Sequence, residues 1–185
     1  MAKKKEMRII AGDFRGRNLI SPKGKAVRPT TDRVREAIFN ILGNITNCDF
    51  LDLFAGTGAV SFEALSRGAS SATLVDKNLR TAQKNAELLG VNHKVSWKKL
   101  DIDRFLASAT SKTYDVIFVD PPYELALDIH LQVLTFAEKT LLEDGILIFE
   151  HKKKCELSER AGTMQRSQIR LYGDTAISLY EHEER

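Results

Sequence analysis

Cysteine is scarce in this sequence, where Cys48 and Cys155 are the only two among 185 residues. Two cysteines alone cannot form a disulfide scaffold or a four-ligand zinc site, so we expect a reducing, cytoplasmic location. Long apolar runs are also missing, because no stretch approaches the roughly 20 residues that span a bilayer, and no membrane association is expected. The four histidines are scattered without metal-ligand spacing, and no metal site is predicted.

Basic residues are concentrated near the start of the sequence. Residues 1–35 contain eleven Lys and Arg but only three Asp and Glu, a net charge of +8, whereas the other 150 residues carry −5. A basic segment on a mildly acidic body is typical of proteins that bind a polyanionic partner such as nucleic acid. The alternative is that the basic segment only makes the terminus more soluble. The length fits one domain with a small extension, and we place the boundary between residues 1–44 and 45–185.

The basic segment predicts a short hairpin followed by a helix. Residues 8–10 and 17–20 are extended stretches on either side of a glycine-containing loop. A helix capped by Thr31 or Asp32 then runs to Gly43, with an apolar face formed by Val34, Ile38, Ile41 and Leu42.

From residue 45 onward, short apolar runs alternate with helical stretches. Strands are expected at residues 50–54, 72–76, 95–100, 114–120 and 145–150, and an antiparallel hairpin at 168–180. Helices are expected between the strands, the last of them with one apolar face formed by Leu127, Leu131, Leu134 and Leu141. This alternation predicts an α/β fold with a doubly wound, mostly parallel sheet, in which ligands bind at the carboxyl ends of the strands.

A glycine-rich turn follows the first of these strands, in the stretch Asp52-Leu53-Phe54-Ala55-Gly56-Thr57-Gly58. Glycine lets the backbone approach a ligand closely, which favours a cofactor site at this turn. Val60 and Ser61 stand where a dinucleotide fingerprint has its third glycine or alanine. An ordinary strand-to-helix turn is therefore the alternative.

Acidic residues end the next two predicted strands. Asp76 lies 20 residues beyond Gly56, at a place where a carboxylate can accept both hydroxyls of a ribose, and a helix N-cap is the alternative. Asp101 and Asp103 can accept from an exocyclic amine, and Ile102 can cover an adenine face. Both acids are also suitable helix caps, so the choice between them is open.

The sharpest motif is Asp120-Pro121-Pro122-Tyr123, at the end of the fourth predicted strand. Two prolines fix the backbone and remove two N–H donors. The carbonyls of the turn are then available to accept hydrogen bonds from a ligand. Acceptors beside a flat aromatic ring are what an amino group on a planar base requires. A stiff loop with a buried tyrosine is the alternative. Further along, Lys152-Lys153-Lys154 is interpreted as a solvated helix start, with RNA contact as the less favoured interpretation.

Taken together, the Asp52–Gly58 turn, the acid ending strand two and the Asp-Pro-Pro-Tyr motif resemble class I S-adenosylmethionine-dependent methyltransferases that act on exocyclic amines. Residues 8–12, 15–17 and 28–36, with Phe39-Asn40, are similar to the bacterial 16S rRNA guanine-N2-methyltransferases of the RsmD type. The resemblance spans nearly the whole chain and implies a seven-stranded sheet whose last hairpin inserts an antiparallel strand.

The resemblance also implies roles for individual residues. Residues implied to bind S-adenosylmethionine are Arg28, Thr30, Asp52, Phe54, Ala55, Gly56, Thr57, Gly58, Asp76, Lys77, Asp101, Ile102 and Asp120. Residues implied to grip the target amine are Asp120, Pro121, Pro122 and Tyr123. Residues implied to contact 16S rRNA, presented by an assembled or partly assembled small subunit to a monomeric enzyme, are Arg8, Arg15, Arg17, Arg33 and Arg35.

Other functions are weighed against this one. Adenine-N6 and glutamine-N5 methyltransferases share the proline motif, and the amino-terminal match favours rRNA guanine over both. A catalytically silent RNA-binding assembly factor predicts degraded cofactor residues, whereas Gly56, Gly58, Asp76 and Asp120 are all present. A nicotinamide-dependent oxidoreductase is disfavoured by the missing third glycine and by the proline turn.

Overall fold

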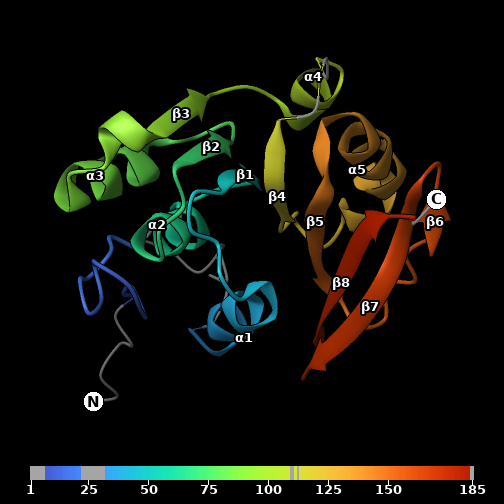
Figure 1. The fold of residues 1–185 in the computed structure, drawn as a ribbon, viewed down its shortest axis with the longest axis horizontal. Helices are drawn as coiled ribbons and strands as arrows, with labels where there is room; N and C mark the ends of the chain where they lie inside the picture. The colour runs from blue at the N-terminus through green and yellow to red at the C-terminus, as the bar shows by residue number, and fades with distance from the viewer. Residues whose placement is uncertain (1–6, 22–31, 109–110, 112, 184–185) are drawn as a thin grey trace.

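One eight-stranded sheet forms the centre of the molecule (Figure 1). The computed structural model describes residues 7–21, 32–108, 111 and 113–183. The strands are arranged in the order β3-β2-β1-β4-β5-β8-β7-β6. Their bounds are β1 Asp49–Leu53, β2 Ser71–Val75, β3 Val95–Lys98, β4 Tyr114–Val119, β5 Leu141–Lys152, β6 Arg160–Ala161, β7 Met164–Tyr172 and β8 Thr175–His182.

The first five strands pair in parallel, and β8 pairs with β5 in the antiparallel direction. This arrangement confirms the predicted doubly wound, mostly parallel sheet. The strand count exceeds the seven expected, because the two-residue β6 adds a short edge strand beside β7. The strand order reverses between β1 and β4, and a crevice at the carboxyl ends of strands opens at such a switch point.

Helices cover both faces of the sheet. They are α1 Asp32–Leu42, α2 Ala59–Ser66, α3 Arg80–Leu89, α4 Ile102–Leu106 and α5 Ala126–Thr140, with one 3-10 turn at Asn92–Lys94. Alternate residues of β1 point to opposite faces. Phe50 belongs to the core cluster that includes α1, α2 and α3, and Leu51 belongs to the cluster that includes α4 and α5. In the part of the chain that the structure describes, no helix is long and apolar enough to cross a membrane.

The apolar face predicted for α5 is correct at Leu134 but wrong at the other three leucines. Leu127 and Leu131 are 59% and 55% exposed, and Leu141 begins β5 rather than ending the helix. Besides Leu134, the helix buries Ala126, Ile129, His130, Val133, Phe136, Ala137 and Thr140. Several of these residues are small, which lets the helix approach the sheet closely, whereas a search for large apolar residues selects the wrong face.

The amino-terminal hairpin and α1 share a hydrophobic core with the sheet. An isolated bridge between Arg8 and Asn18 marks the predicted hairpin, although neither side is long enough to count as a strand. Met7, Ile9 and Leu19 are buried in the same cluster as Val34 and Ile38 of α1 and the residues of β1 and β2. The proposed boundary at residues 44 and 45 stays a prediction.

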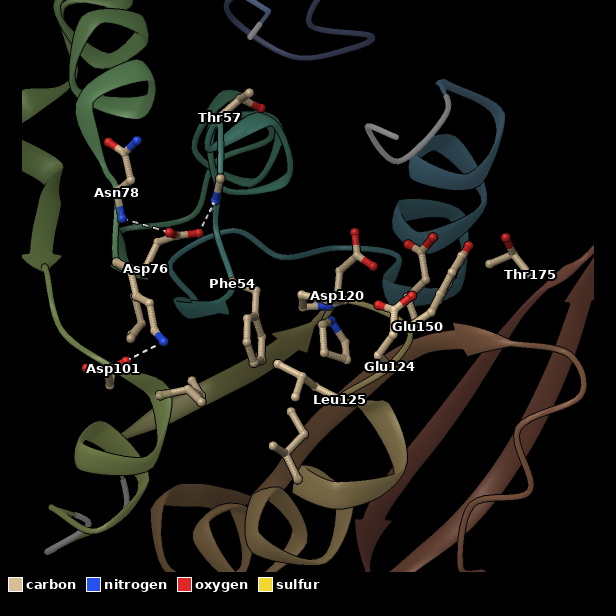
Figure 2. Close-up of a pocket in the computed structure, with 18 of the residues that line it drawn as sticks. Phe54, Thr57, Asp76, Asn78, Asp101, Asp120, Glu124, Leu125, Glu150 and Thr175 are labelled. Carbon is tan, nitrogen blue, oxygen red and sulfur yellow. Dashed lines mark hydrogen bonds and ion pairs between the residues drawn. The ribbon is translucent and has the colours of Figure 1, made fainter. Parts of the chain in front are cut away.

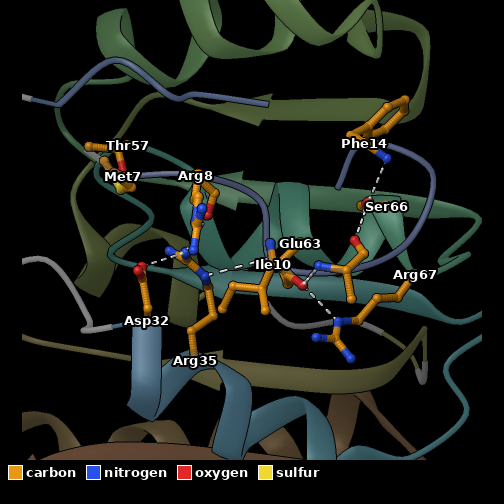
Figure 3. Close-up of polar contacts among 11 residues, drawn as sticks. Met7, Arg8, Ile10, Phe14, Asp32, Arg35, Thr57, Glu63, Ser66 and Arg67 are labelled. Atoms are coloured by element: carbon orange, nitrogen blue, oxygen red, sulfur yellow. Dashed lines mark hydrogen bonds and ion pairs between the residues drawn. The ribbon is translucent and has the colours of Figure 1, made fainter. Parts of the chain in front are cut away.

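Glu63 of α2 connects the hairpin to the body of the protein (Figure 3). Its fully buried carboxylate accepts hydrogen bonds from the backbone amides of Ile10 at 2.7 Å and Ala11 at 3.0 Å. It also pairs with Arg67 at 2.8 Å and lies 3.8 Å from Nε of Arg35. Three segments that are distant in the sequence therefore meet at one acid.

Candidate functional site

A pocket of about 930 Å³ lies at the carboxyl ends of β1, β2, β3 and β4 (Figure 2). Its position at the switch point between β1 and β4 agrees with the rule for doubly wound sheets. Tyr172, Gly173 and Thr175, from the turn between β7 and β8, close one side. Of the site residues predicted from the sequence, the pocket brings together Arg33, Phe54, Gly56, Thr57, Asp76, Lys77, Asp101, Ile102, Asp103, Asp120, Pro121, Pro122 and Tyr123.

The glycine turn uses its two glycines differently. A Cβ atom on Gly56 would meet only the carbonyl oxygen of Phe54, at 3.9 Å, so the bare backbone leaves open space beside the pocket. A Cβ atom on Gly58 would lie 2.4 Å from the ring of Phe62, and φ of Gly58 is +75°. Gly58 is thus required by the packing of α2 against the turn, and it does not line the pocket.

Phe54 has a strained backbone at the edge of the pocket. Its φ of +67° is unusual for a bulky residue, and such conformations persist where the surrounding structure over-determines them, often at functional sites. The amides of Phe54 and Ala55 both donate to the carbonyl of Val75, at 3.0 and 3.1 Å. These hydrogen bonds hold the turn after β1 against the end of β2.

Asp76 occupies the position predicted for ribose binding and also supports the glycine turn. One carboxylate oxygen accepts the amide of Gly56 at 2.9 Å, and the other accepts the amide of Asn78 at 2.8 Å. The N-cap position of α3 is Leu79, so Asp76 is not the cap that the alternative interpretation required. A carboxylate offers about four lone-pair sites, so these two bonds leave acceptor capacity that faces the pocket.

Lys77 and Asp101 form an ion pair of 2.5 Å along the pocket wall. Both side chains are largely exposed, so the pair contributes little to stability. The neighbouring carboxylate raises the pKa of Lys77, mainly through its hydrogen bond. Asp101 stands at the N-cap position of α4 without a side-chain cap bond, which leaves its carboxylate directed to Lys77.

The Asp120–Tyr123 turn lies at one end of the pocket, with two further acids. Figure 2 shows Asp120, Glu124 and Glu150 grouped there, while Asp76 and Asp101 lie toward the other end. Glu150 is only 5% exposed and follows Phe149, whose register partner on β4 is Val119. Asp120 and Glu150 therefore occupy matching positions on adjacent strands, and such strands lie about 4.8 Å apart.

Asp52 lies behind the site rather than in it. Its carboxylate is buried and accepts a hydrogen bond from the Ser61 hydroxyl at 2.6 Å. Burial, with the nearby charges of Asp120 and Asp76, raises the pKa of Asp52 to about 7, although the Ser61 hydrogen bond opposes this rise. Asp52 and Ala55 do not line the pocket, so their predicted contact with a cofactor is not supported by the geometry.

The comparison with known proteins agrees with this geometry. A family model described as "Conserved hypothetical protein 95" matches residues 7–181. The chain is 32% identical over 180 residues to "Ribosomal RNA small subunit methyltransferase D" of Escherichia coli (strain K12), with 96% of this chain and 91% of the relative covered.

The chain belongs to the RsmD-type family of class I methyltransferases. It is also 35% identical over 181 residues to the protein YlbH of Bacillus subtilis (strain 168), covering 95% of this chain and 98% of that protein. The solved structure of yhhF from Escherichia coli is similar with a TM-score of 0.85 and 30% identity, covering 97% of this chain and 99% of that one.

The five arginines predicted to bind RNA differ in their exposure and in their position relative to the pocket. Arg8, Arg15 and Arg17 are exposed on the hairpin, outside the pocket, whereas Arg33 lines the pocket. The prediction for Arg35 is corrected: its side chain is 0% exposed and cannot reach RNA. Arg28 and Thr30, predicted to bind the cofactor, lie outside the described residues.

Arg35 instead joins the hairpin to α1. Its Nη2 donates to the carbonyl of Arg8 at 2.5 Å and to Asp32 at 3.1 Å. Burial lowers the pKa of Arg35, and the charges of Glu63 and Asp32 oppose that effect. The resemblance implies RNA contact for Arg35, but its partners Arg8, Asp32 and Glu63 hold this side chain inside the protein.

Sequence reasoning missed several residues of the pocket. Glu150 sits in an apolar strand with no motif around it, and Thr175 and Tyr172 enter the site through the antiparallel hairpin. The one available signal was the position of Glu150 at the carboxyl end of a predicted central strand. That signal applies to any parallel strand of a doubly wound sheet.

Proposed function

We propose that this protein transfers a methyl group from S-adenosylmethionine to the exocyclic N2 amine of one guanine in 16S rRNA. The observation that carries the proposal is the Asp120–Tyr123 turn, which brings a carboxylate, a proline carbonyl and an aromatic ring to one end of an acidic pocket. The Escherichia coli relative is named as a small-subunit rRNA methyltransferase, and this name supports rRNA as the substrate.

The charge and shape of the pocket fit S-adenosylmethionine, whose sulfonium and ammonium groups are cationic. The pocket is lined by six acids and two bases, and these acids are Asp76, Asp101, Asp103, Asp120, Glu124 and Glu150. Acids raise the local concentration of a cation and stabilise it once it is bound. The volume of about 930 Å³ leaves room for a target base beside the cofactor.

Individual residues suit the parts of the cofactor. The remaining acceptor capacity of Asp76 would hold the ribose hydroxyls, and the open backbone at Gly56 would let the cofactor lie close to the turn. Ile102 would cover the adenine, with Asp101 or Asp103 accepting its amine. When bound, the cofactor supplies an electrophilic methyl group.

The chain must make a poor nucleophile reactive, because the lone pair of a guanine amine is delocalised into the ring. Asp120 and the carbonyl of Pro121 would accept hydrogen bonds from the two N–H groups of the amine and pull the nitrogen toward tetrahedral geometry. Most of the catalysis would then come from positioning and electrostatics. The proton released after transfer would pass to Asp120 or to water.

Tyr123 would stack on a base turned out of its own helix. Stacking of a base on an aromatic side chain is worth about 1–3 kcal/mol. That gain offsets part of the few kcal/mol needed to extrude the nucleotide. Tyr123 would therefore contribute to substrate binding rather than to proton transfer.

Glu150 supports guanine over adenine as the target. Guanine presents the N1–H and N2–H donors side by side, whereas adenine presents an acceptor at N1 next to its amine. The buried carboxylate of Glu150, beside Asp120, can accept a hydrogen bond from the N1–H of guanine and would repel the adenine N1 lone pair. Enzymes that extrude a base read it through hydrogen bonds of this kind.

The decisive experiment incubates the protein and labelled S-adenosylmethionine with naked 16S rRNA and, separately, with small subunits. Mass mapping of the rRNA should then find one methylated guanine, carrying the methyl group on N2. The subunit is the expected substrate, in assembled or partly assembled form, and a monomeric enzyme is expected. Reactions without the protein serve as the control. Methyl transfer to adenine, or no transfer to either substrate, would contradict the proposal.

A further inference from the structure

Three consecutive lysines lie at the end of β5 and in the turn that follows it, where Lys152 contacts Tyr123 of the pocket lining. Lys152 is the last residue of β5, and Lys153 and Lys154 follow in a turn. The interpretation of this stretch as a helix start is therefore wrong, because β5 continues to Lys152 through its pairing with Thr175 of β8. All three lysine side chains are exposed.

The backbone of the lysine turn is fixed against the pocket wall. The amide of Lys153 donates to the carbonyl of Asp174 at 2.9 Å, and the amide of Cys155 donates to the carbonyl of Lys152 at 2.9 Å. Asp174 belongs to the turn between β7 and β8, whose neighbouring residues Gly173 and Thr175 line the pocket. The lysine turn is thus a fixed part of the pocket entrance.

Lys152 also contacts the proposed stacking platform. Its ammonium lies 4.7 Å from the centre of the Tyr123 ring, within the range of a cation–π contact. This contact places a positive charge beside the ring face on which a base would stack. Any nucleotide bound at Tyr123 would bring its phosphate groups near this lysine.

The charge of the pocket makes such a rim necessary. Six acids line the interior and suit a cationic cofactor, but they repel a polyanionic RNA strand. Among the described residues that line the pocket, the bases are Arg33 and Lys77, and Lys77 is paired with Asp101. The three exposed lysines lie outside the pocket lining, and the first of them, Lys152, contacts Tyr123, where the strand would enter.

We propose that Lys152, Lys153 and Lys154 form a phosphate-binding surface for the RNA strand that carries the target base. Lys152 holds the Tyr123 ring in the free protein and moves to a phosphate of the bound nucleotide when the base takes the ring face. This inference rests on the proposed function, since it describes how the same site receives its RNA. The lysine surface would be a second RNA-binding surface, in addition to the one predicted on the amino-terminal hairpin.

The test compares the wild-type protein with a triple variant in which Lys152, Lys153 and Lys154 are each replaced by Gln. Affinity for a single-stranded segment of 16S rRNA is measured by fluorescence anisotropy at several salt concentrations. Each lost phosphate contact should flatten the plot of log affinity against log salt by about 0.7. The triple variant should therefore lose about 2 from the slope. Calorimetric affinity for S-adenosylmethionine should stay within twofold of wild type.

Three further single variants separate the surface from general charge. Lys139→Gln removes an exposed lysine from the last turn of α5, at the end of that helix opposite the pocket, and should leave the slope unchanged. Lys152→Arg keeps the cation and its contact with Tyr123, and should retain most of the affinity that Lys152→Gln loses.

Unchanged slopes in the triple variant, from a protein with unaltered thermal melting, would overturn the inference. A triple variant whose slope falls no more than that of Lys139→Gln would overturn it as well. These outcomes are distinct from a failure of the proposed function, which would appear as absent methyl transfer to rRNA by the wild-type protein. The binding comparison holds in either case, because it needs no turnover.

Discussion

The carboxylate of Asp76 accepts a hydrogen bond from the amide of Gly56 at 2.9 Å, so the acid that follows β2 holds the turn that follows β1. The same carboxylate also accepts the amide of Asn78. A residue expected to bind the ribose therefore also fixes the backbone on which the cofactor would lie. Its loss should affect cofactor binding through both roles.

We expect Asp76→Ala to lower the affinity for S-adenosylmethionine by about ten- to a hundredfold. The loss of one charge-assisted hydrogen bond costs about 1.5–3 kcal/mol, and this free energy corresponds to the expected fall in affinity. Asp76→Asn keeps one acceptor oxygen for Gly56 and should recover part of the loss. Calorimetric titration of the folded variants checks this, and an affinity for Asp76→Ala equal to wild type would remove Asp76 from the cofactor site.

Asp120→Ala should abolish most turnover while keeping cofactor binding, because its proposed partner is the target amine. Asp120→Asn retains an acceptor oxygen without the charge, and an intermediate rate is expected. Single-turnover methyl transfer to small subunits measures both variants. A rate for Asp120→Ala within about twofold of wild type, a difference of roughly 0.4 kcal/mol, would show that the positioning mechanism is wrong.

Glu63→Ala should destabilise the fold strongly. The change removes the acceptor for the amides of Ile10 and Ala11 and leaves the buried charge of Arg35 without one of its acids. Breaking a buried ion pair in this way costs about 3–5 kcal/mol. Urea unfolding gives the free energy directly. Glu87→Ala, at an exposed site on α3, is the control and should change stability by less than about 0.5 kcal/mol.

His130 should make stability depend on pH. The ring is buried between α5 and β8, with Nε2 3.0 Å from the Tyr180 hydroxyl, and burial lowers the pKa of His130 to about 4. Between this value and 6.5 the unfolded chain binds more protons than the folded one, so protonation favours unfolding. The contribution of His130 is complete above pH 6.5 and is lost as the pH falls toward 4.

The variant His130→Gln isolates this effect, because it removes the titrating ring and can still bond to Tyr180. The stability advantage of wild type over His130→Gln should shrink by up to about 3 kcal/mol between pH 7 and pH 4. Asp52, whose pKa is raised, acts in the opposite sense, but it is present in both proteins and cancels in the difference. A difference that does not vary with pH would contradict the prediction.

Replacing Arg8, Arg15 and Arg17 by Gln should weaken binding to rRNA and flatten its salt dependence by about 2, since each phosphate contact contributes about 0.7. Substitution is the better test than deletion, because Met7, Ile9 and Leu19 of the same segment are buried in the core. Cofactor affinity should not change. Normal turnover and an unchanged salt slope would contradict the prediction and would show that these arginines only increase solubility.

The sequence by itself determined the succession of strands along the chain and the motifs at their ends. β1, β2 and β4 are short apolar runs that can be recognised from neighbouring residues alone. Each strand is followed within a few residues by its acidic residue or its turn motif. Because parallel strands place their carboxyl ends at one edge, Gly56, Asp76 and Asp120 could be assigned to one site before their distances were known.

Only the tertiary structure decided which other side chains enter that site and which leave it. Thr175 reaches the pocket because β8 inserts beside β5, and Glu150 reaches it because β5 pairs with β4. The pairing of Lys152 with Thr175 extends β5 to the point where Lys152 contacts Tyr123. Arg35 turns inward to Glu63, and α5 buries Ile129 rather than Leu127. Burial and pairing depend on the neighbours that an element packs against, and these neighbours are far away in the sequence, where a local pattern carries no information about them.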